Sequence, residues 1–347
     1  MQTIPRLLIV GPIFDTPSGP SGQGGKLYQQ LMAEGYVCLK KSAYRNLPLR
    51  LLDTLWGVCR FWTYDVILLQ SFSLKSFYLQ DAVSLLASIL GKPVIFTLRG
   101  GAFCEFYEQH ARWCKRVLSR AHLINTPSYF IQACIQSKGL KVEYVPNFID
   151  LKRFPFDRSA VKKNTLLWVR AFNDIYHPEL AIEAVGILKD EFPDIRLTML
   201  GPDQSTLLAC QTLIREKGLE TQIDIIGPVP NHELFHYYQT HAVYLNTTRY
   251  ESFGVALVEA ASCGIPCVSV SVGEIPFIWK DEEQMLFAKR DAADFASKIK
   301  RLLSDPSLNL EMGQRANQRA QSFSWNEIKS YWFDRLLAYK RHEGLKS

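Results

Sequence analysis

The sequence predicts an α/β protein in which two doubly wound parallel sheets follow each other along the chain. Short apolar segments alternate with longer segments of helical periodicity, which is typical of a parallel sheet with helices on both faces. This alternation restarts after residue 160. A length of 347 residues fits two or three domains and is enough for two separate hydrophobic cores.

Five apolar segments in the first half are predicted to be buried strands. Residues 7–13, with the sequence LLIVGPI, open the series. The other four lie at 65–70, 93–98, 122–126 and 142–145. Helical periodicity separates them, for example over 76–90 and 105–120.

The second half repeats this organisation. The predicted strands are 165–169, 196–200, 222–226, 242–246 and 266–270, and the helices between them include 178–191 and 205–217. The segment 145–157, VPNFIDLKRFPFD, is rich in proline and aromatic residues and has no helical pattern. We therefore expect a first domain over 1–155 and a second domain over 156–324, followed by a final aromatic-rich helix within 325–347.

Composition narrows the classes of protein to consider. The hydrophobic content of 47% and the charged content of 21% are ordinary for a globular protein. The sequence has no apolar run of about 18 residues, and its first residues resemble a buried strand more than a signal peptide. Eight cysteines are irregularly spaced without a Cys-x-x-Cys pair, so we expect reduced thiols, no zinc site and a cytoplasmic location.

Charge is distributed unevenly along the chain. Residues 1–155 carry 18 Lys and Arg against 9 Asp and Glu, whereas the remainder carries 22 against 25. This asymmetry indicates that the first half meets an anionic partner, although a scattered solvated surface would give the same count. We expect no nucleic acid among the partners.

The most specific motif is the segment Tyr250–Ala260, with the sequence YESFGVALVEA. Ser252 and Gly254 favour a loop that enters a helix, so Glu251 is expected in the loop and Glu259 about one turn into the helix. The start of a helix attracts phosphate, and carboxylates accept hydrogen bonds from sugar hydroxyls. A nucleotide-sugar has this layout of hydroxyls and pyrophosphate. The simpler alternative is a capped surface helix with two solvated glutamates.

This segment and the ASCGIPCV that follows it resemble the E-x7-E signature of the family 4 retaining glycosyltransferases. That resemblance implies the GT-B fold, which consists of two tandem Rossmann-like domains with an interdomain cleft. It also implies that Glu251 contacts the donor sugar and Glu259 the ribose, and that the C-terminal helix returns to pack on the first domain. Segment 145–157 is similar to the family's VPNGVD segment, with Phe148 and Ile149 at the Gly-Val positions.

The resemblance also implies a set of residues on the donor side. Arg170 follows a predicted strand and resembles the phosphate-binding arginine of the family, whereas a surface ion pair is the alternative. Val229, after Gly227-Pro228, lies in the segment expected near the nucleotide base. The backbone N–H groups expected to face the pyrophosphate are those of Phe253, Gly254, Val255 and Ala256.

One position departs from the family pattern. A lysine is expected a few residues after Arg170, but the segment 173–178 reads NDIYHP. Tyr176 or His177 could replace that lysine, or nothing replaces it; His177 would otherwise only precede a helix that starts at Pro178. The chain contains no Asp-x-Asp triplet, so we expect neutralisation of the diphosphate without a metal and no cofactor beyond the donor.

The acceptor side is expected in the first half. The glycine-rich segment 11–31 is too long for the compact dinucleotide fingerprint, and its Gly24 and Gly25 match a family Gly-Gly pair beside the donor phosphate. A plain flexible loop is the alternative. Arg99 and Gly100 end a predicted strand, and Arg99 is expected either to hold an anionic acceptor, such as a phosphate or an acidic sugar, or to support the loop.

Residues 45–62 mix arginine with leucine, tryptophan and phenylalanine. They predict either a helix packed on the sheet or a segment in an anionic membrane interface. The second possibility would add a peripheral location at the inner face of the plasma membrane.

The resulting hypothesis is a metal-independent hexosyl- or other glycosyltransferase that acts with retention. It would transfer a sugar from a nucleotide-diphosphate-sugar to a hydroxyl acceptor, either a glycan or a lipid-linked molecule, in cell-surface polysaccharide or glycolipid synthesis. Two alternatives stay open: a nucleotide-sugar 2-epimerase with a similar two-domain fold, and a catalytically inactive homologue that binds nucleotide or glycan.

Overall fold

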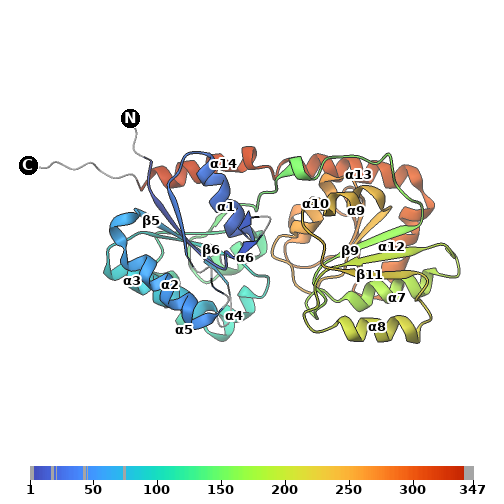
Figure 1. Cartoon of the computed structure of the whole chain (residues 1–347), viewed down its shortest axis with the longest axis horizontal. Helices are drawn as coiled ribbons and strands as arrows, with labels where there is room; N and C mark the ends of the chain where they lie inside the picture. Colours follow the sequence, from blue (N-terminus) through green and yellow to red (C-terminus); the bar gives the residue numbers. More distant parts are fainter. Residues whose placement is uncertain are drawn as a thin grey trace, which may run out of the picture. The chain divides into compact units, whose positions relative to one another are not determined.

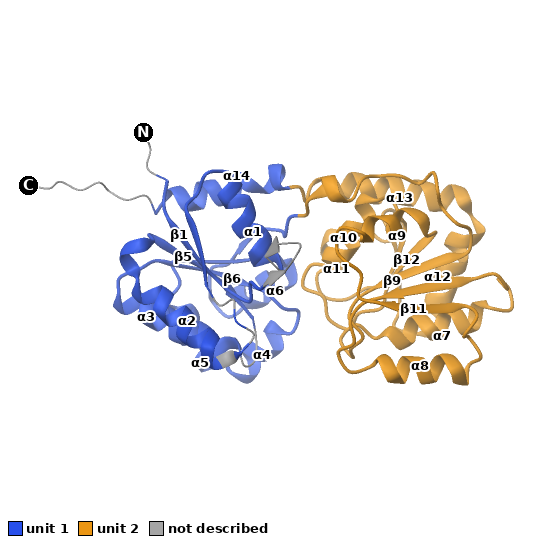
Figure 2. Ribbon diagram, viewed as in Figure 1, with its two compact units in different colours: residues 1–148, 325–347 blue, residues 149–324 orange. Residues whose placement is uncertain are grey.

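The computed structural model describes residues 4–16, 19–20, 22–41, 44, 46–72 and 76–339. The chain divides into two compact units (Figures 1 and 2). Unit 1 contains Met1–Phe148 and Trp325–Ser347, and unit 2 contains Ile149–Ser324. The chain therefore leaves unit 1 once and returns to it for its last helix.

Unit 1 is built on a six-stranded parallel sheet with the order β4-β1-β5-β6-β7-β8. Its strands are β1 Leu7–Val10, β4 Cys38–Lys41, β5 Val66–Ser71, β6 Val94–Leu98, β7 Leu123–Thr126 and β8 Glu143–Tyr144. The short strands β2 Asp15–Thr16 and β3 Gly19–Pro20 pair separately. The direction in which the chain winds reverses between β1 and β5, so a ligand site is expected at the carboxyl ends of these two strands.

Helices cover both faces of this sheet (Figure 1). They are α1 Gly22–Ala33, α2 Leu47–Cys59, α3 Phe77–Ile89, α4 Phe103–Gln109, α5 Ala111–Leu118, α6 Tyr129–Gln136, α14 Trp325–Leu337 and a 3-10 turn at Phe61–Thr63. Leu8 and Val10 of β1 face the core under α3 to α6, and Leu7 and Ile9 face the core under α1 and α14. A strand buried on both faces has to be continuously apolar, as this one is.

Helix α14 is part of the core of unit 1. Its residues Trp325, Ile328, Trp332 and Leu336 are buried against β1 and α1. The indole Nε1 of Trp325 also donates to Oε1 of Glu34 at 2.8 Å. Unit 1 therefore needs the end of the chain to complete its hydrophobic core.

Two expectations about unit 1 are wrong in detail. Residues 105–120 do not form one helix, because the backbone leaves helical geometry at His110, where φ is −129°. The break lets Phe106 and Trp113 both contact Phe77, with ring centroids 5.1 Å and 4.9 Å apart. Their shared burial compensates for the lost helical bonds.

The first unit ends at Phe148 rather than at residue 155. Ile149 and Phe154 are buried in the core of unit 2, and the N–H of Ile149 donates to the carbonyl of Phe323 at 2.8 Å. The proline- and aromatic-rich segment is therefore divided between the two cores: Val145 and Phe148 are buried in unit 1, and the part from Ile149 onward belongs to unit 2.

Unit 2 has a six-stranded parallel sheet with the order β11-β10-β9-β12-β13-β14. The strands are β9 Thr165–Val169, β10 Arg196–Leu200, β11 Ile223–Gly227, β12 Val243–Asn246, β13 Cys267–Val270 and β14 Leu286–Ala288. The helices are α7 Pro178–Leu188, α8 Leu207–Glu216, α9 Leu234–Thr240, α10 Val255–Ser262, α11 Ile275–Ile278, α12 Ala292–Ser304 and α13 Pro306–Gln321, with a 3-10 turn at Leu151–Arg153. Here the winding reverses between β9 and β12.

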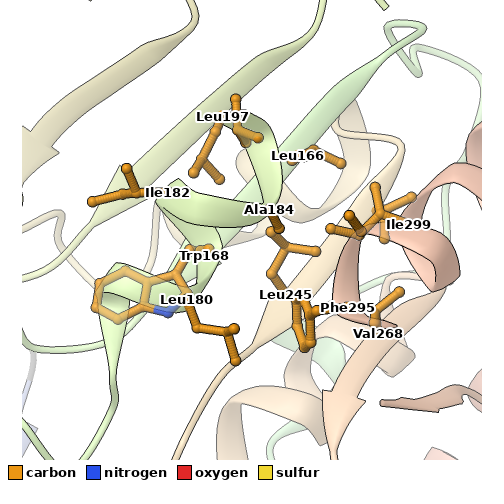
Figure 3. Packing of buried hydrophobic residues seen from close by; sticks show 14 of the residues in the cluster. Leu166, Trp168, Leu180, Ile182, Ala184, Leu197, Leu245, Val268, Phe295 and Ile299 are labelled. Carbon is orange, nitrogen blue, oxygen red and sulfur yellow. The ribbon is translucent and has the colours of Figure 1, made fainter. Parts of the chain in front are cut away.

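The core of unit 2 again lies on both faces of the sheet. Leu166 and Trp168 of β9 pack with Leu180 of α7 and Phe295 of α12 (Figure 3). Leu167, between them in sequence, faces the opposite core. This packing fixes the position at which β9 ends, and therefore the position of the residue that follows it.

Within the described ranges, no helix is both long enough and apolar enough to span a lipid bilayer.

Candidate functional site

Two charged side chains meet where the winding of the unit 2 sheet reverses. Arg170 directly follows β9, and Glu251 lies in the loop after β12. Nη2 of Arg170 is 2.6 Å from Oε2 of Glu251, and only 15% and 11% of the two side chains are exposed. The carboxyl ends of neighbouring parallel strands share one edge of the sheet, so residues 81 positions apart form one ion pair.

The second carboxylate oxygen of Glu251 fixes the loop that leads into α10. Oε1 accepts hydrogen bonds from the N–H groups of Ser252 at 3.0 Å and Phe253 at 3.2 Å. Gly254 then adopts φ of +85°, a conformation that favours glycine, and α10 begins at Val255. Glu251 therefore connects the arginine to the start of this helix.

Four backbone N–H groups were expected to face a pyrophosphate here. That of Phe253 donates to Glu251, and the phenylalanine ring is buried in the core. Those of Gly254, Val255 and Ala256 precede the first i→i−4 bond of the helix, which Val258 donates to Gly254 at 3.2 Å. Three of the four amides thus remain outside the helical hydrogen-bond pattern and can bind an anion.

Arg170 is held in a charged state by its surroundings. Burial alone would lower the pKa of its guanidinium, but the charge of Glu251, followed by Tyr244 and Tyr176, raises this pKa above the usual value. The ring of Tyr176 lies against the guanidinium, with its centroid 5.1 Å from Cζ. The side chain is therefore cationic at any physiological pH and held on two sides.

Two glycines that the sequence did not single out as site residues allow this arrangement. A Cβ on Gly201 would overlap the carbonyl oxygen of Arg170, and a Cβ on Gly273 would overlap that of Glu251. Gly201 directly follows the predicted strand 196–200, a position at which glycine is usually only part of a turn. Gly273 follows β13 and had no motif to mark it, because its importance depends on a contact with a loop far away in sequence.

A pocket of about 300 Å³ adjoins Arg170 at this sheet edge. Arg170, Tyr176 and Val229 all line it, so the structure places Val229 close to the arginine. Its other lining residues are Val169, Ala171, Leu200, Gly201, Pro202, Gln204, Pro228 and Leu234. The lining combines one cation with the polar side chains of Tyr176 and Gln204 and several apolar residues, which suits a phosphate attached to a flat organic group.

Glu259 lies one turn into α10 and is only 4% exposed. Burial, together with the charge of Glu259 among other neighbours, raises the pKa of Tyr238 and Tyr244. The alternative of two solvated glutamates on a surface helix is therefore wrong, because both carboxylates are largely withdrawn from water.

Neither candidate for the missing lysine supplies a positive charge. His177 precedes α7 with φ of +45°, and burial and the nearby Arg249 and Arg290 lower its pKa to about 4. The imidazole is therefore neutral at pH 7. Tyr176 carries no positive charge either, and it contributes by stacking on Arg170.

The residues after β12 hold the segment that carries Tyr176. Thr247 Oγ1 donates to the carbonyl of Tyr176 at 2.6 Å, and Thr248 Oγ1 donates to that of Ile175 at 3.2 Å. The N–H of Arg249 donates to the same Ile175 carbonyl at 2.7 Å. No sequence motif predicts these contacts; Thr247 and Thr248 only follow a predicted strand.

The residues expected on the acceptor side lie in unit 1. Gly24 and Gly25 are buried in the first turn of α1. Arg99 follows β6 and is 9% exposed, and Gly100 has φ of +97° with open space where a side chain would be. Residues 17, 18 and 21 of the glycine-rich segment, like Arg45 of segment 45–62, lie outside the described residues.

The sequence also predicts that no metal ion takes part in binding the diphosphate. Across the described part of the chain, no group of three or more His, Cys, Asp or Glu side chains is placed to hold a metal ion.

Comparison with known proteins agrees with this geometry. Residues 152–319 match the family model described as glycosyl transferases group 1. Unit 2 of this chain belongs to the group 1 glycosyltransferases. The match covers the Arg170–Glu251 pair, the pocket and helix α10, so the site described above lies within the matched extent of a glycosyltransferase unit.

Two relatives illustrate the similarity. D-inositol 3-phosphate glycosyltransferase of Pseudarthrobacter chlorophenolicus is 26% identical over 218 residues, which cover 59% of this chain and 52% of the relative. The protein of the same name from Frankia alni is 31% identical over 183 residues, which cover 50% of this chain and 44% of the relative. The chain spans about half the length of the curated relatives it matches.

Solved structures match the whole architecture. Sucrose-phosphate synthase from Thermosynechococcus elongatus gives a TM-score of 0.79 at 19% identity and covers 96% of this chain and 99% of its own. HepE from Anabaena, in complex with UDP and glucose, gives a TM-score of 0.79 at 14% identity. The match covers 96% of this chain and 100% of the HepE chain. The expected glycosyltransferase fold with two tandem Rossmann-like units is confirmed.

Proposed function

We propose that this chain is a retaining glycosyltransferase that moves a sugar from a nucleotide-diphosphate-sugar to a hydroxyl acceptor. The observation that carries this proposal is the Arg170–Glu251 pair beside the start of α10, in a unit of the group 1 family. The pair provides one cation for a diphosphate and one carboxylate for hydroxyl groups, next to amides that can bind phosphate oxygens.

Catalysis in this proposal depends on charge stabilisation and positioning. As the bond between the anomeric carbon and the diphosphate breaks, Arg170 and the amides of Gly254, Val255 and Ala256 stabilise the negative charge of the leaving group. Glu251 orients the donor sugar, and Glu259 binds the ribose. No covalent nucleophile on the protein is needed, because the acceptor hydroxyl attacks the face from which the diphosphate leaves.

A screen with UDP-, GDP- and ADP-sugars tests the donor chemistry. A donor that binds the folded chain stabilises it by about 2.7 kcal/mol at a hundredfold excess over Kd. We expect one nucleotide class to raise Tm, and prolonged incubation to release the nucleoside diphosphate and a sugar of unchanged anomeric configuration. Absence of a shift with every donor would contradict the proposal.

Product analysis separates the two alternatives. An epimerase would release the 2-epimeric sugar without any acceptor, and an inactive homologue would show a Tm shift without turnover over hours. We further propose that the reaction needs no metal, so that turnover is the same with and without EDTA; complete loss in EDTA that Mg²⁺ restores would contradict this part.

We also propose that unit 1 approaches an anionic membrane surface at the cytoplasmic face through α2. Leu49, Leu52 and Trp56 recur at helical spacing on this helix and are 52%, 66% and 65% exposed. Trp62, just after it, is 59% exposed. We expect the chain to co-float with anionic liposomes and a Leu52→Ser, Trp56→Ser variant to stay in solution. Equal flotation of both proteins, or of neither, would remove this idea.

A further inference from the structure

Unit 1 has a polar centre at the place where its own sheet reverses its winding. Gln70 is the fifth residue of β5 and is 2% exposed, and Arg99 directly follows the neighbouring β6. The N–H of Arg99 donates to the carbonyl of Ser71 at 2.7 Å, which fixes the arginine against the end of β5. Gly11, after β1, completes the group at the carboxyl ends of the central strands.

The charge of Arg99 is buried without a carboxylate. Its Nε donates to Oε1 of Gln70 at 2.6 Å, and its Nη1 donates to Oδ1 of Asn147. No acidic side chain in the described part of the chain forms an ion pair with it. Burial lowers its pKa only to about 10, so it stays charged at neutral pH. These two amide oxygens accept hydrogen bonds from the guanidinium but do not neutralise its charge. Burial of an unneutralised charge in a protein interior costs free energy.

The arginine determines which way the Gln70 amide faces. A guanidinium can only donate, so the oxygen of Gln70 has to face Arg99 and its NH₂ group has to face away. That nitrogen, Nε2, is buried and has no hydrogen-bond partner among the described residues. An unsatisfied buried donor of this kind points to an acceptor that arrives from outside the chain.

Arg50 supplies a second donor in the same place. It lies on α2, and its Nε is likewise buried without a partner in the described ranges. Arg50 and Gln70 both line one pocket of about 90 Å³, with Val10, Gly11, Pro12, Leu69, Phe72, Ser76, Leu79 and Gln80. None of these lining residues is acidic, and the volume equals that of roughly three water molecules at about 30 Å³ each.

Glycine backbones hold Gln70 in this position. A Cβ on Gly11 would lie 2.8 Å from Cβ of Gln70, and one on Gly24 would lie 3.0 Å from its Cγ. Both distances are shorter than ordinary van der Waals contact, so the glutamine packs directly against two backbones. The buried Gly24 is therefore explained by contact with this side chain as well as by its place in α1.

We propose that this pocket binds a phosphate group of the acceptor, with Arg50 and the NH₂ of Gln70 as donors and Arg99 as the positioning residue behind the amide. Two converging donor groups, a cation behind them and no acidic lining residue match an oxyanion better than a neutral hydroxyl. The assignment to the acceptor rests on the proposed function, whereas phosphate binding itself does not.

Thermal unfolding of the full chain with inorganic phosphate tests the site. At tenfold excess over Kd, phosphate should raise Tm of the wild type by about 3–5 °C. Arg50→Gln and Gln70→Glu should lose this shift. Gln70→Glu keeps the oxygen that Arg99 needs and adds a compensating charge, so its Tm without phosphate should equal or exceed that of the wild type.

Arg112→Gln is the matched control, because it removes an exposed arginine of α5 and should keep the phosphate shift. Arg170→Gln removes the cation of unit 2 and shows how much of the shift comes from that unit. A shift that disappears in Arg170→Gln but persists in Arg50→Gln and Gln70→Glu would overturn the proposal. No shift in the wild type at 50 mM phosphate would overturn it as well. These readouts contain no nucleotide, so failure of the phosphate site and failure of the glycosyltransferase proposal are distinguishable.

Competition identifies the source of the phosphate group. Displacement of phosphate by glycerol 3-phosphate would indicate a soluble acceptor. Displacement only by vesicles of phosphatidylcholine with phosphatidic acid would indicate a lipid-linked one. Displacement by neither would contradict the assignment of the site to an acceptor.

Discussion

At the scale of single residues, Gly273 shows how the backbone of unit 2 fixes the position of Glu251. It has φ of +55°, and a Cβ there would overlap the carbonyl of Glu251. We expect Gly273→Ala to destabilise the chain by about 1–3 kcal/mol and to lower kcat/KM about a hundredfold, because Glu251 has to move. Chemical denaturation and initial rates measure the two effects.

Gly218→Ala is the control for that substitution. Gly218 has a similar φ of +60°, but open space surrounds the position of its missing Cβ. This variant should cost only the conformational strain, about 1 kcal/mol, and leave kcat/KM unchanged. Equal activity in the two variants would show that contact with Glu251 does not matter.

His177 gives a prediction for pH. Its pKa is about 4 in the folded chain against 6.5 for the unperturbed group, so the unfolded state binds more protons between these two values. The neutral imidazole therefore contributes its full share to the free energy of unfolding above pH 6.5. This contribution is lost as the pH falls towards 4. We expect Tm of His177→Asn to fall less than that of the wild type over this window.

Asparagine tolerates the positive φ at this position, so the comparison isolates the titration from backbone strain. Parallel Tm profiles for the two proteins between pH 6.5 and pH 4 would mean that His177 does not titrate differently on folding.

At the scale of elements, α14 is expected to act as a structural part of unit 1. Trp332 is 3% exposed in the core that this helix shares with β1 and α1. Trp332→Ala should lower the free energy of unfolding by about 3–5 kcal/mol, because the substitution leaves a large cavity. Urea titration followed by far-ultraviolet circular dichroism measures this loss.

Trp56→Ala is the comparison for that experiment, since Trp56 is 65% exposed on α2. Its removal should change stability by at most about 0.5 kcal/mol. If both substitutions had the same small effect, the assignment of α14 to the core of unit 1 would be wrong.

Elements also show what sequence could and could not predict. Apolar segments predicted most of the central strands, and the family resemblance assigned both Arg170 and Glu251 to the donor side. The break at His110 was not predictable, because it serves aromatic contacts with Phe77. The pocket of Arg50 and Gln70 was not predictable either, since it depends on the side-chain packing of two separate elements.

At the scale of the whole molecule, both units place polar residues where the winding of the sheet reverses. In unit 2 these are Arg170 and Glu251, and in unit 1 they are Gln70 and the adjoining Arg99. The positive charge excess of residues 1–155 agrees with an anionic ligand for unit 1, although Arg50 and Arg99 account for only part of it. The same architectural rule thus predicts one ligand site per unit.

The central claim is that Arg170 and Glu251 act on a nucleotide-sugar. The most direct test is the initial rate of nucleoside diphosphate release from the donor found in the screen, for wild type, Arg170→Ala, Glu251→Gln and Arg196→Ala. Arg196 is the first residue of β10, so it lies at the amino ends of the strands, away from the site at their carboxyl ends. It serves as the control. We predict a loss of about 10²–10³-fold for the first two variants and none for the third, with all proteins folded. Wild-type rates in Arg170→Ala and Glu251→Gln would contradict the assignment of this site.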